Sequence, residues 1–341
     1  MTPWILVSAA IAFLITAFLA RRFCNPASSL YLLDHPNERS LHTQPTPRTG
    51  GVAILTGIFS VVFVWLFAVG GDNTSAWLMA GAGLIAALSF LDDRRGLSAR
   101  TRFFGHVIGA GLVVFGGDLV LPAFSSGMSA IESTWLGLSL SVLYLVWMVN
   151  LYNFMDGMDG FAGGMALIGF STFAILGLLG GNLLFTVLSL VIAASAGGFL
   201  VFNFPPARIF MGDTGSAALG LLAGGLSLWG ARDGLFPFWA ALLVFSPFIV
   251  DASVTLVRRL FLGERVWQAH KTHYYQRLVQ CGWGHRKTVL SEYTLVLACS
   301  FSALLATQVS TSGRTALVFF WCLTYLLLMF GVNRLEKKKK S

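Results

Sequence analysis

Long apolar stretches, separated by short polar segments, occupy most of the 341-residue chain. Each stretch is close to the roughly 20 residues that an α-helix needs to cross a bilayer. The eleven stretches cover residues 3–20, 52–70, 76–91, 103–121, 136–150, 161–180, 182–202, 214–230, 235–257, 289–310 and 314–333. This pattern predicts an all-α membrane protein, a polytopic bundle of about eleven transmembrane helices. It also predicts one integral-membrane domain over residues 1–341, because no polar stretch is long enough for a separate soluble domain.

Composition supports the same class. The chain is 56% hydrophobic and 11% charged, whereas about 25% of the residues in a soluble domain are charged. A formal net charge of +8 can indicate a nucleic-acid-binding protein. Here the basic residues gather in the loops between the apolar stretches, so we predict no nucleic-acid partner.

The basic residues also predict the topology. If the first loop is cytoplasmic, Arg232 and Arg314 are the only two of the 23 Lys and Arg residues that face outward. By the positive-inside rule, the N-terminus lies outside and the basic C-terminus lies in the cytoplasm. Arg21 and Arg22 follow the first span without a small-residue cleavage pattern, which indicates a retained anchor. The cytoplasmic loops are then 21–51, 92–102, 150–160, 203–213 and 258–288. The predicted location is the inner, cytoplasmic membrane.

Acidic residues stand at the ends of several apolar stretches, all on the predicted cytoplasmic side. They are Asp92 and Asp93 after the third stretch, Asp156 and Asp159 after the fifth, and Asp213 before the eighth. Ionisable groups at membrane depth are costly and are by default a functional hypothesis. Adjacent carboxylates repel, so one pKa in a pair rises unless a cation neutralises the charge. Mg²⁺ prefers oxygen ligands and shares them with substrate phosphates, so these acids indicate a divalent cation and a phosphorylated substrate. A helix end exposed to water explains the first pair equally well.

The second acidic pair lies among other polar groups. If the segment is helical, the spacing of three puts Asp156 and Asp159 on one side. Asn150 and Asn153 repeat that spacing and add amide donors and acceptors. A flexible Gly-rich loop with solvated acids is the structural alternative, and the density of polar groups favours a site.

The residues before the eighth stretch are typical of a helix N-terminus. Asp213 and Thr214 can cap a helix or form an anion-binding end. Asp213 can also hold a metal that bridges a phosphate. Arg208 lies in the same loop and adds a positive charge for substrate binding.

Two further loops supply cations. Arg48, in a Pro- and Gly-rich loop, can bind a lipid phosphate at the interface, although a plain polar loop explains that segment equally well. In the last large loop, His270, Lys271, His273 and Arg277 form a cationic cluster. Because no Cys or acid lies near it, the cluster favours phosphate contact over zinc.

One acid lies inside an apolar stretch rather than at its end. Asp251 precedes Arg258 by about two helical turns. An internal ion pair or hydrogen bond and a role in the site explain it equally well.

Taken together, these segments resemble the polyprenyl-phosphate N-acetylhexosamine-1-phosphate transferase family, which is bacterial glycosyltransferase family 4. The resemblance runs over nearly the whole chain. It is carried by Pro45–Gly51, Asp92 and Asp93, Asn153–Gly160, Phe210–Ser216 and a histidine-bearing last loop. It implies a bundle of about ten or eleven transmembrane helices with a cytoplasmic active site that depends on Mg²⁺, with Mn²⁺ as a substitute.

The resemblance also implies a reaction. A polyprenyl phosphate, expected to be undecaprenyl phosphate, attacks the β-phosphorus of a UDP-sugar and gives polyprenyl-diphospho-sugar and UMP. We expect Asp213 to be the strongest metal ligand, Asp93 a second ligand and Asp92 the base. The other expected catalytic residues are Asp156, Asp159, His270 and His273. The expected substrate-binding residues are Arg48, Asn150, Asn153, Arg208, Thr214, Lys271 and Arg277.

The last loop distinguishes branches of that family. The phospho-muramoyl-pentapeptide branch carries adjacent histidines followed by an acid, whereas His270 and His273 are three residues apart. That spacing more closely resembles the branch that initiates lipopolysaccharide O-antigen units from UDP-linked N-acetylated amino sugars. The alternatives are the peptidoglycan-precursor transferase of the same family and, from a different class, a cation- or proton-coupled membrane transporter. A homodimer is one of the oligomeric states left open.

Overall fold

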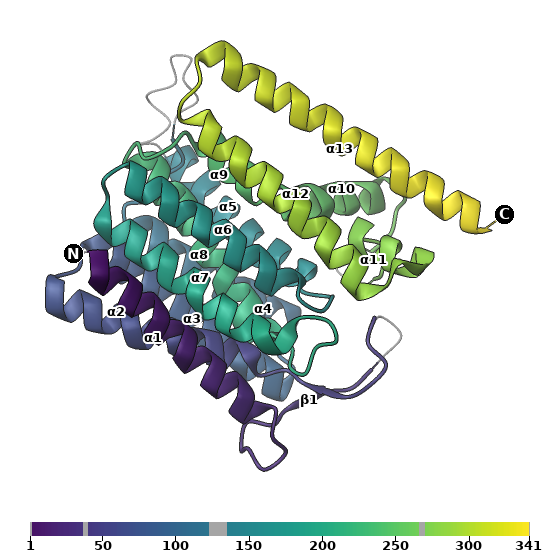
Figure 1. Cartoon of the computed structure of the whole chain (residues 1–341), viewed down its shortest axis with the longest axis horizontal. Helices are drawn as coiled ribbons and strands as arrows, with labels where there is room; N and C mark the ends of the chain where they lie inside the picture. The colour runs from purple at the N-terminus through teal and green to yellow at the C-terminus, as the bar shows by residue number, and fades with distance from the viewer. Residues whose placement is uncertain (1, 37–39, 123–134, 266–269, 341) are drawn as a thin grey trace.

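Helices make up most of the computed structural model, which describes residues 2–36, 40–122, 135–265 and 270–340. The first part contains α1 (Thr2–Phe23), the short strands β1 (Leu33–Asp34) and β2 (Thr46–Pro47), α2 (Gly50–Val69), α3 (Asn73–Arg95), α4 (Ala99–Gly111) and the π-helical turn η1 (Leu112–Gly116). The second part contains α5 (Trp135–Met155), α6 (Phe161–Leu179), α7 (Leu183–Asn203), α8 (Gly212–Arg232), α9 (Phe238–Val244), α10 (Ser246–Phe261), α11 (Tyr274–Leu278), the π-helical turn η2 (Val279–Trp283), α12 (Gly284–Ala306) and α13 (Thr311–Lys340). Figure 1 shows the long helices side by side in one bundle, with the antiparallel β1–β2 hairpin and α11 at the same end.

The predicted class, an all-α polytopic membrane protein, is confirmed. Eight helices in the described ranges are long and apolar enough to span a bilayer, or nine if the bent pair α9 and α10 forms one span. Each of the eleven predicted stretches coincides with a helix or with two consecutive helices. However, α8 and the α4–η1 pair are not among those nine, so the number eleven stays a prediction.

Helix α8 is less apolar because protein rather than lipid surrounds it. Every residue from Thr214 to Gly230 is buried. Glycines allow the neighbouring helices to approach closely: a Cβ on Gly220 would lie 2.5 Å from the carbonyl oxygen of Met148, and one on Gly51 would lie 2.3 Å from the backbone nitrogen of Gly215. Small residues at helix contacts are a principal packing device inside membranes. The result is a central helix whose N-terminus reaches the hairpin end of the bundle.

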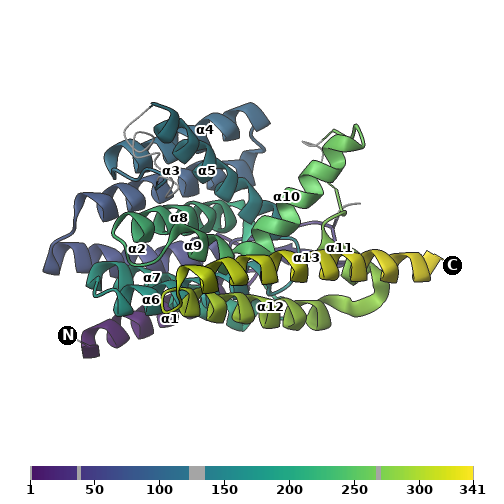
Figure 2. The same cartoon turned by 90° about the horizontal axis from the view of Figure 1, so that it is seen from above.

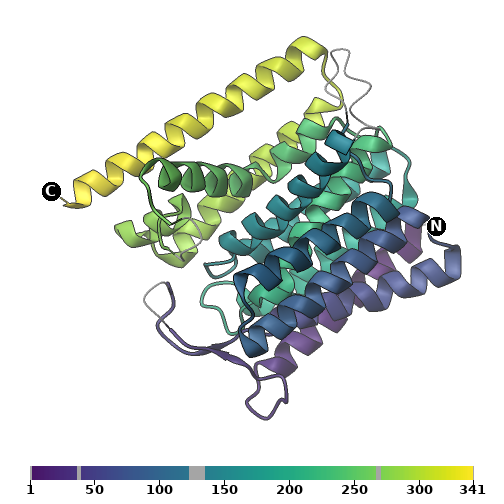
Figure 3. The same ribbon diagram turned by 180° about the vertical axis from the view of Figure 1, so that it is seen from behind.

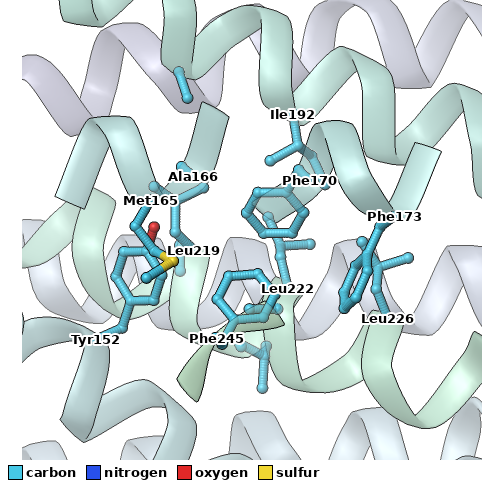
Figure 4. Close-up of a cluster of buried hydrophobic side chains, with 14 of the residues drawn as sticks. Tyr152, Met165, Ala166, Phe170, Phe173, Ile192, Leu219, Leu222, Leu226 and Phe245 are labelled. Carbon is cyan, nitrogen blue, oxygen red and sulfur yellow. The ribbon is translucent and has the colours of Figure 1, made fainter. Parts of the chain in front are cut away.

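Aromatic and aliphatic side chains fill the interior beside α8. The rings of Phe170 and Phe173 lie 5.7 and 5.4 Å from the ring of Phe245 in edge-on contacts, an arrangement that aromatic rings favour. Figure 4 shows these rings with Leu222 and Leu226 of α8. This core fixes the relative positions of the helices that carry the acidic segments.

The chain bends by 81° between α9 and α10. Ser246, the first residue of α10, donates its hydroxyl to the carbonyl of Leu243 at 2.7 Å, and Pro247 follows in the first turn, where a missing N–H costs no helical hydrogen bond. After the bend, α10 leaves the bundle at an angle (Figure 2). Helix α10 thereby carries Asp251 to the start of α11. The carboxylate of Asp251 accepts hydrogen bonds from the first backbone N–H groups of α11.

The two termini lie at opposite ends of the bundle (Figures 1 and 3). Termini at opposite ends of the bundle are the arrangement expected for a chain that crosses the membrane an odd number of times. The sidedness, with the N-terminus outside and the C-terminus cytoplasmic, stays a prediction from the charge distribution.

Candidate active site

A cavity of about 640 Å³ lies at the bundle end that holds the hairpin and α11. All five aspartates singled out from the sequence line it, namely Asp92, Asp93, Asp156, Asp159 and Asp213. Five of the expected binding and catalytic residues line it with them, namely Arg48, Asn150, Asn153, His270 and His273. Segments far apart in the chain therefore meet in one concave, polar space of the kind that binds small molecules.

Asp93 lies against the N-terminus of α8. Its Oδ2 accepts the backbone N–H of Thr214 at 3.1 Å and the hydroxyl of the same residue at 2.7 Å. Met211, at the N-cap position, provides no side-chain cap, so Asp93 caps α8 from another helix, where a negative charge is favourable. Arg48 donates from Nη2 to the backbone carbonyl of Asp93. With 6% of its side chain exposed, Asp93 is largely occupied by protein donors.

Asp92 faces an arginine that the sequence analysis did not select. Its Oδ2 lies 3.1 Å from Nη1 of Arg102, and its Oδ1 accepts the N–H of Leu97 at 2.6 Å. The same Nη1 lies 3.6 Å from Oδ2 of Asp213. Arg102 therefore links the first and third acidic segments.

Asp156, just beyond the end of α5, has an unfavourable environment for charge. Burial, and then repulsion from Asp213 and Asp93, raises the pKa of its carboxyl to about 8. No donor within the described ranges forms a hydrogen bond to this carboxylate to offset that cost. A cation bound beside it would relieve the repulsion.

The donor set around Asp156 and Asp213 fits Mg²⁺. Asp213 is 39% exposed, which leaves its oxygens accessible. In the part of the chain that the structure describes, no group of three or more His, Cys, Asp or Glu side chains is arranged to hold a metal ion, so protein side chains alone would fill at most part of its shell. Mg²⁺ commonly takes one or two carboxylates and completes its shell with water and substrate phosphate, so an open oxygen-rich site of this kind suits it.

The remaining polar residues of the second acidic segment hold the loops in place. Oδ2 of Asp159 accepts the N–H of Ala207 at 3.0 Å, and its Oδ1 lies 3.1 Å from Nδ1 of His285. Asn153 donates to the hydroxyl of Ser216 at 3.0 Å. The second acidic segment is thus tied to the α7–α8 loop and to the first turns of α8 and α12.

Asn150 lies one turn further back on α5. Its Nδ2 donates to the carbonyl of Val146 at 2.7 Å and lies 3.5 Å from Nδ1 of His106. His106 also lines the cavity and was not selected from the sequence.

The two histidines of the last loop have different environments. His273 is buried, and its Nδ1 lies 3.2 Å from Oδ1 of Asp251. The carboxylate of Asp251 also accepts the N–H groups of Tyr274 at 2.9 Å and Tyr275 at 3.1 Å. Of the two interpretations of Asp251, the internal hydrogen-bonding one describes these contacts, and through them Asp251 positions a histidine of the site.

His270 does not carry the positive charge near neutral pH that we expected of it. Its ring lies 4.8 Å from that of His273. Burial, followed by the charges of His273 and Arg259, lowers the pKa of His270 to about 4. Near pH 7 the imidazole is therefore neutral, and it can accept or donate one hydrogen bond rather than balance phosphate charge.

Four expected substrate-binding residues are not part of the cavity wall, namely Arg208, Thr214, Lys271 and Arg277. Thr214 instead positions Asp93. The guanidinium of Arg208 lies 4.7 Å from the centroid of the Phe202 ring, at an exposed position of the α7–α8 loop. Thr214 therefore acts on the site through Asp93.

The expectation for Arg277 needs the clearest correction. This side chain is 7% exposed and donates from Nη2 to Glu336 at 2.6 Å and to Asn333 at 2.5 Å, both on α13. Its charge therefore fastens the end of α13 to α11 instead of facing a substrate phosphate.

The hairpin adds residues that the sequence analysis did not rank as site residues. Asp34 and His42 line the cavity, and Asp34 lies 3.7 Å from His42 and 3.9 Å from Arg48. The ring of His42 lies 4.9 Å from that of Phe210. In the sequence, the only indication that Asp34 and His42 belong to the site is that they lie close to Arg48.

Known proteins share this organisation at the sequence level. Residues 74–231 match the family model described as Glycosyl transferase family 4. The chain is 32% identical over 311 residues to the probable undecaprenyl-phosphate N-acetylglucosaminyl 1-phosphate transferase of Bacillus subtilis. The aligned region covers 90% of this chain and 86% of that protein. The chain belongs to glycosyl transferase family 4. It is also 34% identical over 319 residues to the decaprenyl-phosphate N-acetylglucosaminephosphotransferase of Mycolicibacterium smegmatis, and the aligned region covers 83% of this chain and 77% of that protein. The phospho-N-acetylmuramoyl-pentapeptide-transferase of Desulforudis audaxviator is 31% identical to this chain over 338 residues, and the aligned region covers 86% of this chain and 96% of that protein.

Membership of family 4 confirms the resemblance to the polyprenyl-phosphate N-acetylhexosamine-1-phosphate transferases. It also confirms the class of enzyme, a glycosyl-1-phosphate transferase. The segment that matches the family model contains five of the six aspartates that line the cavity, all except Asp34. His270 and His273 lie beyond it.

Proposed function

We propose that this family 4 protein transfers an N-acetylhexosamine 1-phosphate from a UDP-sugar to polyprenyl phosphate, with undecaprenyl phosphate as the acceptor. The products are polyprenyl-diphospho-sugar and UMP. The meeting of three distant aspartate segments in one cavity at one end of a membrane bundle carries the proposal. The names of the relatives support a polyprenyl-phosphate acceptor and an N-acetylglucosamine donor.

The bond changes are those of a phosphoryl transfer. An oxygen of the lipid phosphate attacks the β-phosphorus of the UDP-sugar, and the bond from that phosphorus to the oxygen bridging the two phosphates breaks. UMP leaves with the bridging oxygen, while the sugar keeps its own phosphate. Positioning and charge neutralisation dominate such reactions. The guanidinium groups of Arg48 and Arg102, both on the cavity wall, supply part of the positive charge.

Mg²⁺ is the proposed cofactor, with Mn²⁺ as a substitute. Asp213 would be the first ligand because its carboxylate is accessible. Asp156 would be a better second ligand than Asp93, because Asp93 already accepts two hydrogen bonds from Thr214. When bound there, the ion would offset negative charge on the diphosphate.

Asp92 stays the candidate base that keeps the lipid phosphate dianionic. The second pKa of a phosphate is ~6, so its contribution near neutral pH would be modest. The basic loops support a site at the cytoplasmic face of the inner membrane. The spacing of His270 and His273 supports a role at the start of O-antigen or related surface-polysaccharide assembly.

The test is a panel of radiolabelled UDP-sugars with polyprenyl phosphate, with and without Mg²⁺, in which UMP and lipid-linked sugar are both measured. We expect Mg²⁺-dependent turnover of a UDP-N-acetylhexosamine. Turnover of UDP-MurNAc-pentapeptide instead would assign the peptidoglycan branch, which the 31% identity to such a transferase keeps as second candidate. Ion flux in proteoliposomes without release of UMP would favour a transporter.

A further inference from the structure

A histidine without a role in the reaction so far lies on the cavity wall. His285, in the first turn of α12, lines the cavity and has a side chain that is 19% exposed. Its Nδ1 lies 3.1 Å from Oδ1 of Asp159. Asp159 is itself fixed, because its other oxygen accepts the N–H of Ala207. The imidazole is therefore held in one orientation by a carboxylate that cannot easily move.

The backbone before α12 brings His285 to this position. Gly282 and Gly284 have φ angles of 97° and 69°, which residues with a Cβ rarely adopt. This sharp turn starts α12 at the cavity. Further along the helix, Tyr293 donates its hydroxyl to the carbonyl of Gly160 at 2.5 Å. Helix α12 therefore contacts the Asp159–Gly160 turn twice, once from the cavity wall and once from behind it.

The pairing with Asp159 determines what the other ring nitrogen can do. An ionised carboxylate accepts hydrogen bonds and donates none, so Nδ1 of His285 carries the proton. In the neutral imidazole, Nε2 then has a free lone pair. Among the described residues, no hydrogen-bond partner of Nε2 is present. With the imidazole in its neutral form, the cavity wall thus presents a fixed hydrogen-bond acceptor.

The chemistry of the two substrates decides which of them this acceptor suits. The head of a polyprenyl phosphate offers phosphate oxygens, which are acceptors themselves. A UDP-sugar offers hydroxyl groups on both sugars, an amide N–H and the uracil N–H. We propose that His285 binds the nucleotide-sugar donor by accepting a hydrogen bond through Nε2 from one of those groups, with Asp159 as its positioning residue. The inference rests on the proposed function, which supplies the donor.

Two substitutions separate the two ring nitrogens. In His285→Asn the amide nitrogen can take the place of Nδ1 and keep the contact with Asp159, but nothing replaces Nε2. In His285→Gln the amide reaches the region of Nε2 and can offer its oxygen there. Tyr293→Phe is the matched control, because it loosens the same turn from behind the cavity wall.

We expect His285→Asn to raise the KM and the Kd for the UDP-sugar by about three- to tenfold, the loss of one ordinary hydrogen bond. The KM for polyprenyl phosphate and the melting temperature should stay at their wild-type values. His285→Gln should raise the donor KM less, and Tyr293→Phe should lower the melting temperature at a wild-type donor KM. A wild-type donor Kd in His285→Asn, or equal effects of His285→Asn and Tyr293→Phe, would overturn the inference.

Direct binding separates this inference from the proposed function. If wild-type protein binds a UDP-sugar but releases no UMP from it, the proposed reaction fails, and the Kd values of the variants still test His285. If wild-type protein binds none of the UDP-sugars, both are overturned.

Discussion

Thr214 donates both its backbone N–H and its hydroxyl to the same carboxylate oxygen of Asp93. The two residues are 121 positions apart in the sequence. This double contact aligns the N-terminus of α8, which carries Asp213, with the acidic end of α3. Thr214 is therefore a positioning residue rather than the substrate ligand that the sequence indicated.

Replacing Thr214 should affect turnover through Asp93. Thr214→Val keeps the shape of the side chain but removes the hydroxyl, and a hydrogen bond to a charged group is worth about 1.5–3 kcal/mol. We expect the rate of UMP release at saturating Mg²⁺ to fall by about tenfold or more. Thr214→Ser keeps the hydroxyl and should stay close to wild type. Equal rates of UMP release in both variants would show that the hydroxyl of Thr214 does not affect turnover.

Asp213→Asn should abolish Mg²⁺-dependent turnover. The accessible carboxylate is the proposed first ligand, and loss of such an electrostatic group costs a factor of about 100 or more. The measurement is UMP release across a Mg²⁺ titration. Asp72→Asn is the control: Asp72 caps α3 at the far end of the bundle by accepting the N–H of Ser75, and Asn caps a helix equally well. Wild-type turnover in Asp213→Asn would contradict the metal assignment.

Mg²⁺ binding should strengthen as the pH rises. Burial and the neighbouring Asp213 and Asp93 raise the pKa of Asp156 to about 8, so below that pH the carboxyl holds a proton that a metal ion must displace. The Kd for Mg²⁺ should fall by up to about tenfold per pH unit between pH 6 and 8 and level off above. Calorimetric titration without substrate measures this, and two buffers of different ionisation enthalpy report the released proton. Asp156→Asn should flatten the profile; a flat profile in the wild-type protein would show that Asp156 is not involved.

Arg277 should matter for stability rather than for substrate affinity. Arg277→Gln removes the buried end of the α11–α13 contact and Glu336→Gln removes its partly exposed end, and we expect each to cost about 1–3 kcal/mol. Because both changes break one interaction, the double variant should cost less than the sum. Thermal unfolding and donor KM values are measured together. A raised donor KM at wild-type melting temperature would restore the substrate role.

The sequence was sufficient to find the aspartates. Charge at the end of a long apolar stretch is rare enough to stand out, and Asp92, Asp156 and Asp213 each occupy such a position. The helical class follows from the same contrast. Helix α8 shows where this reasoning is weakest: its small residues reflect contact with other helices, which a hydropathy pattern does not record.

Individual roles depended on partners that no sequence spacing reveals. Thr214 and Arg277 look like phosphate ligands until Asp93 and Glu336 are placed beside them. His285 had no signal beyond its presence in a basic loop that is predicted to be cytoplasmic, because its relation to Asp159 exists only after α12 folds back on the α5–α6 turn.

The bend between α9 and α10 has a consequence for how the site is held. Asp92, Asp93 and Asp213 sit on helices that pack together in the interior. His273, in contrast, contacts Asp251 on a helix that departs from the bundle and exposes Leu260 and Phe261. One side of the cavity is thus fixed to the packed bundle, and the other side to a helix that projects from it. A tilt of α10 with bilayer thickness would move the imidazole of His273 together with Asp251, while Asp92, Asp93 and Asp213 would stay in place.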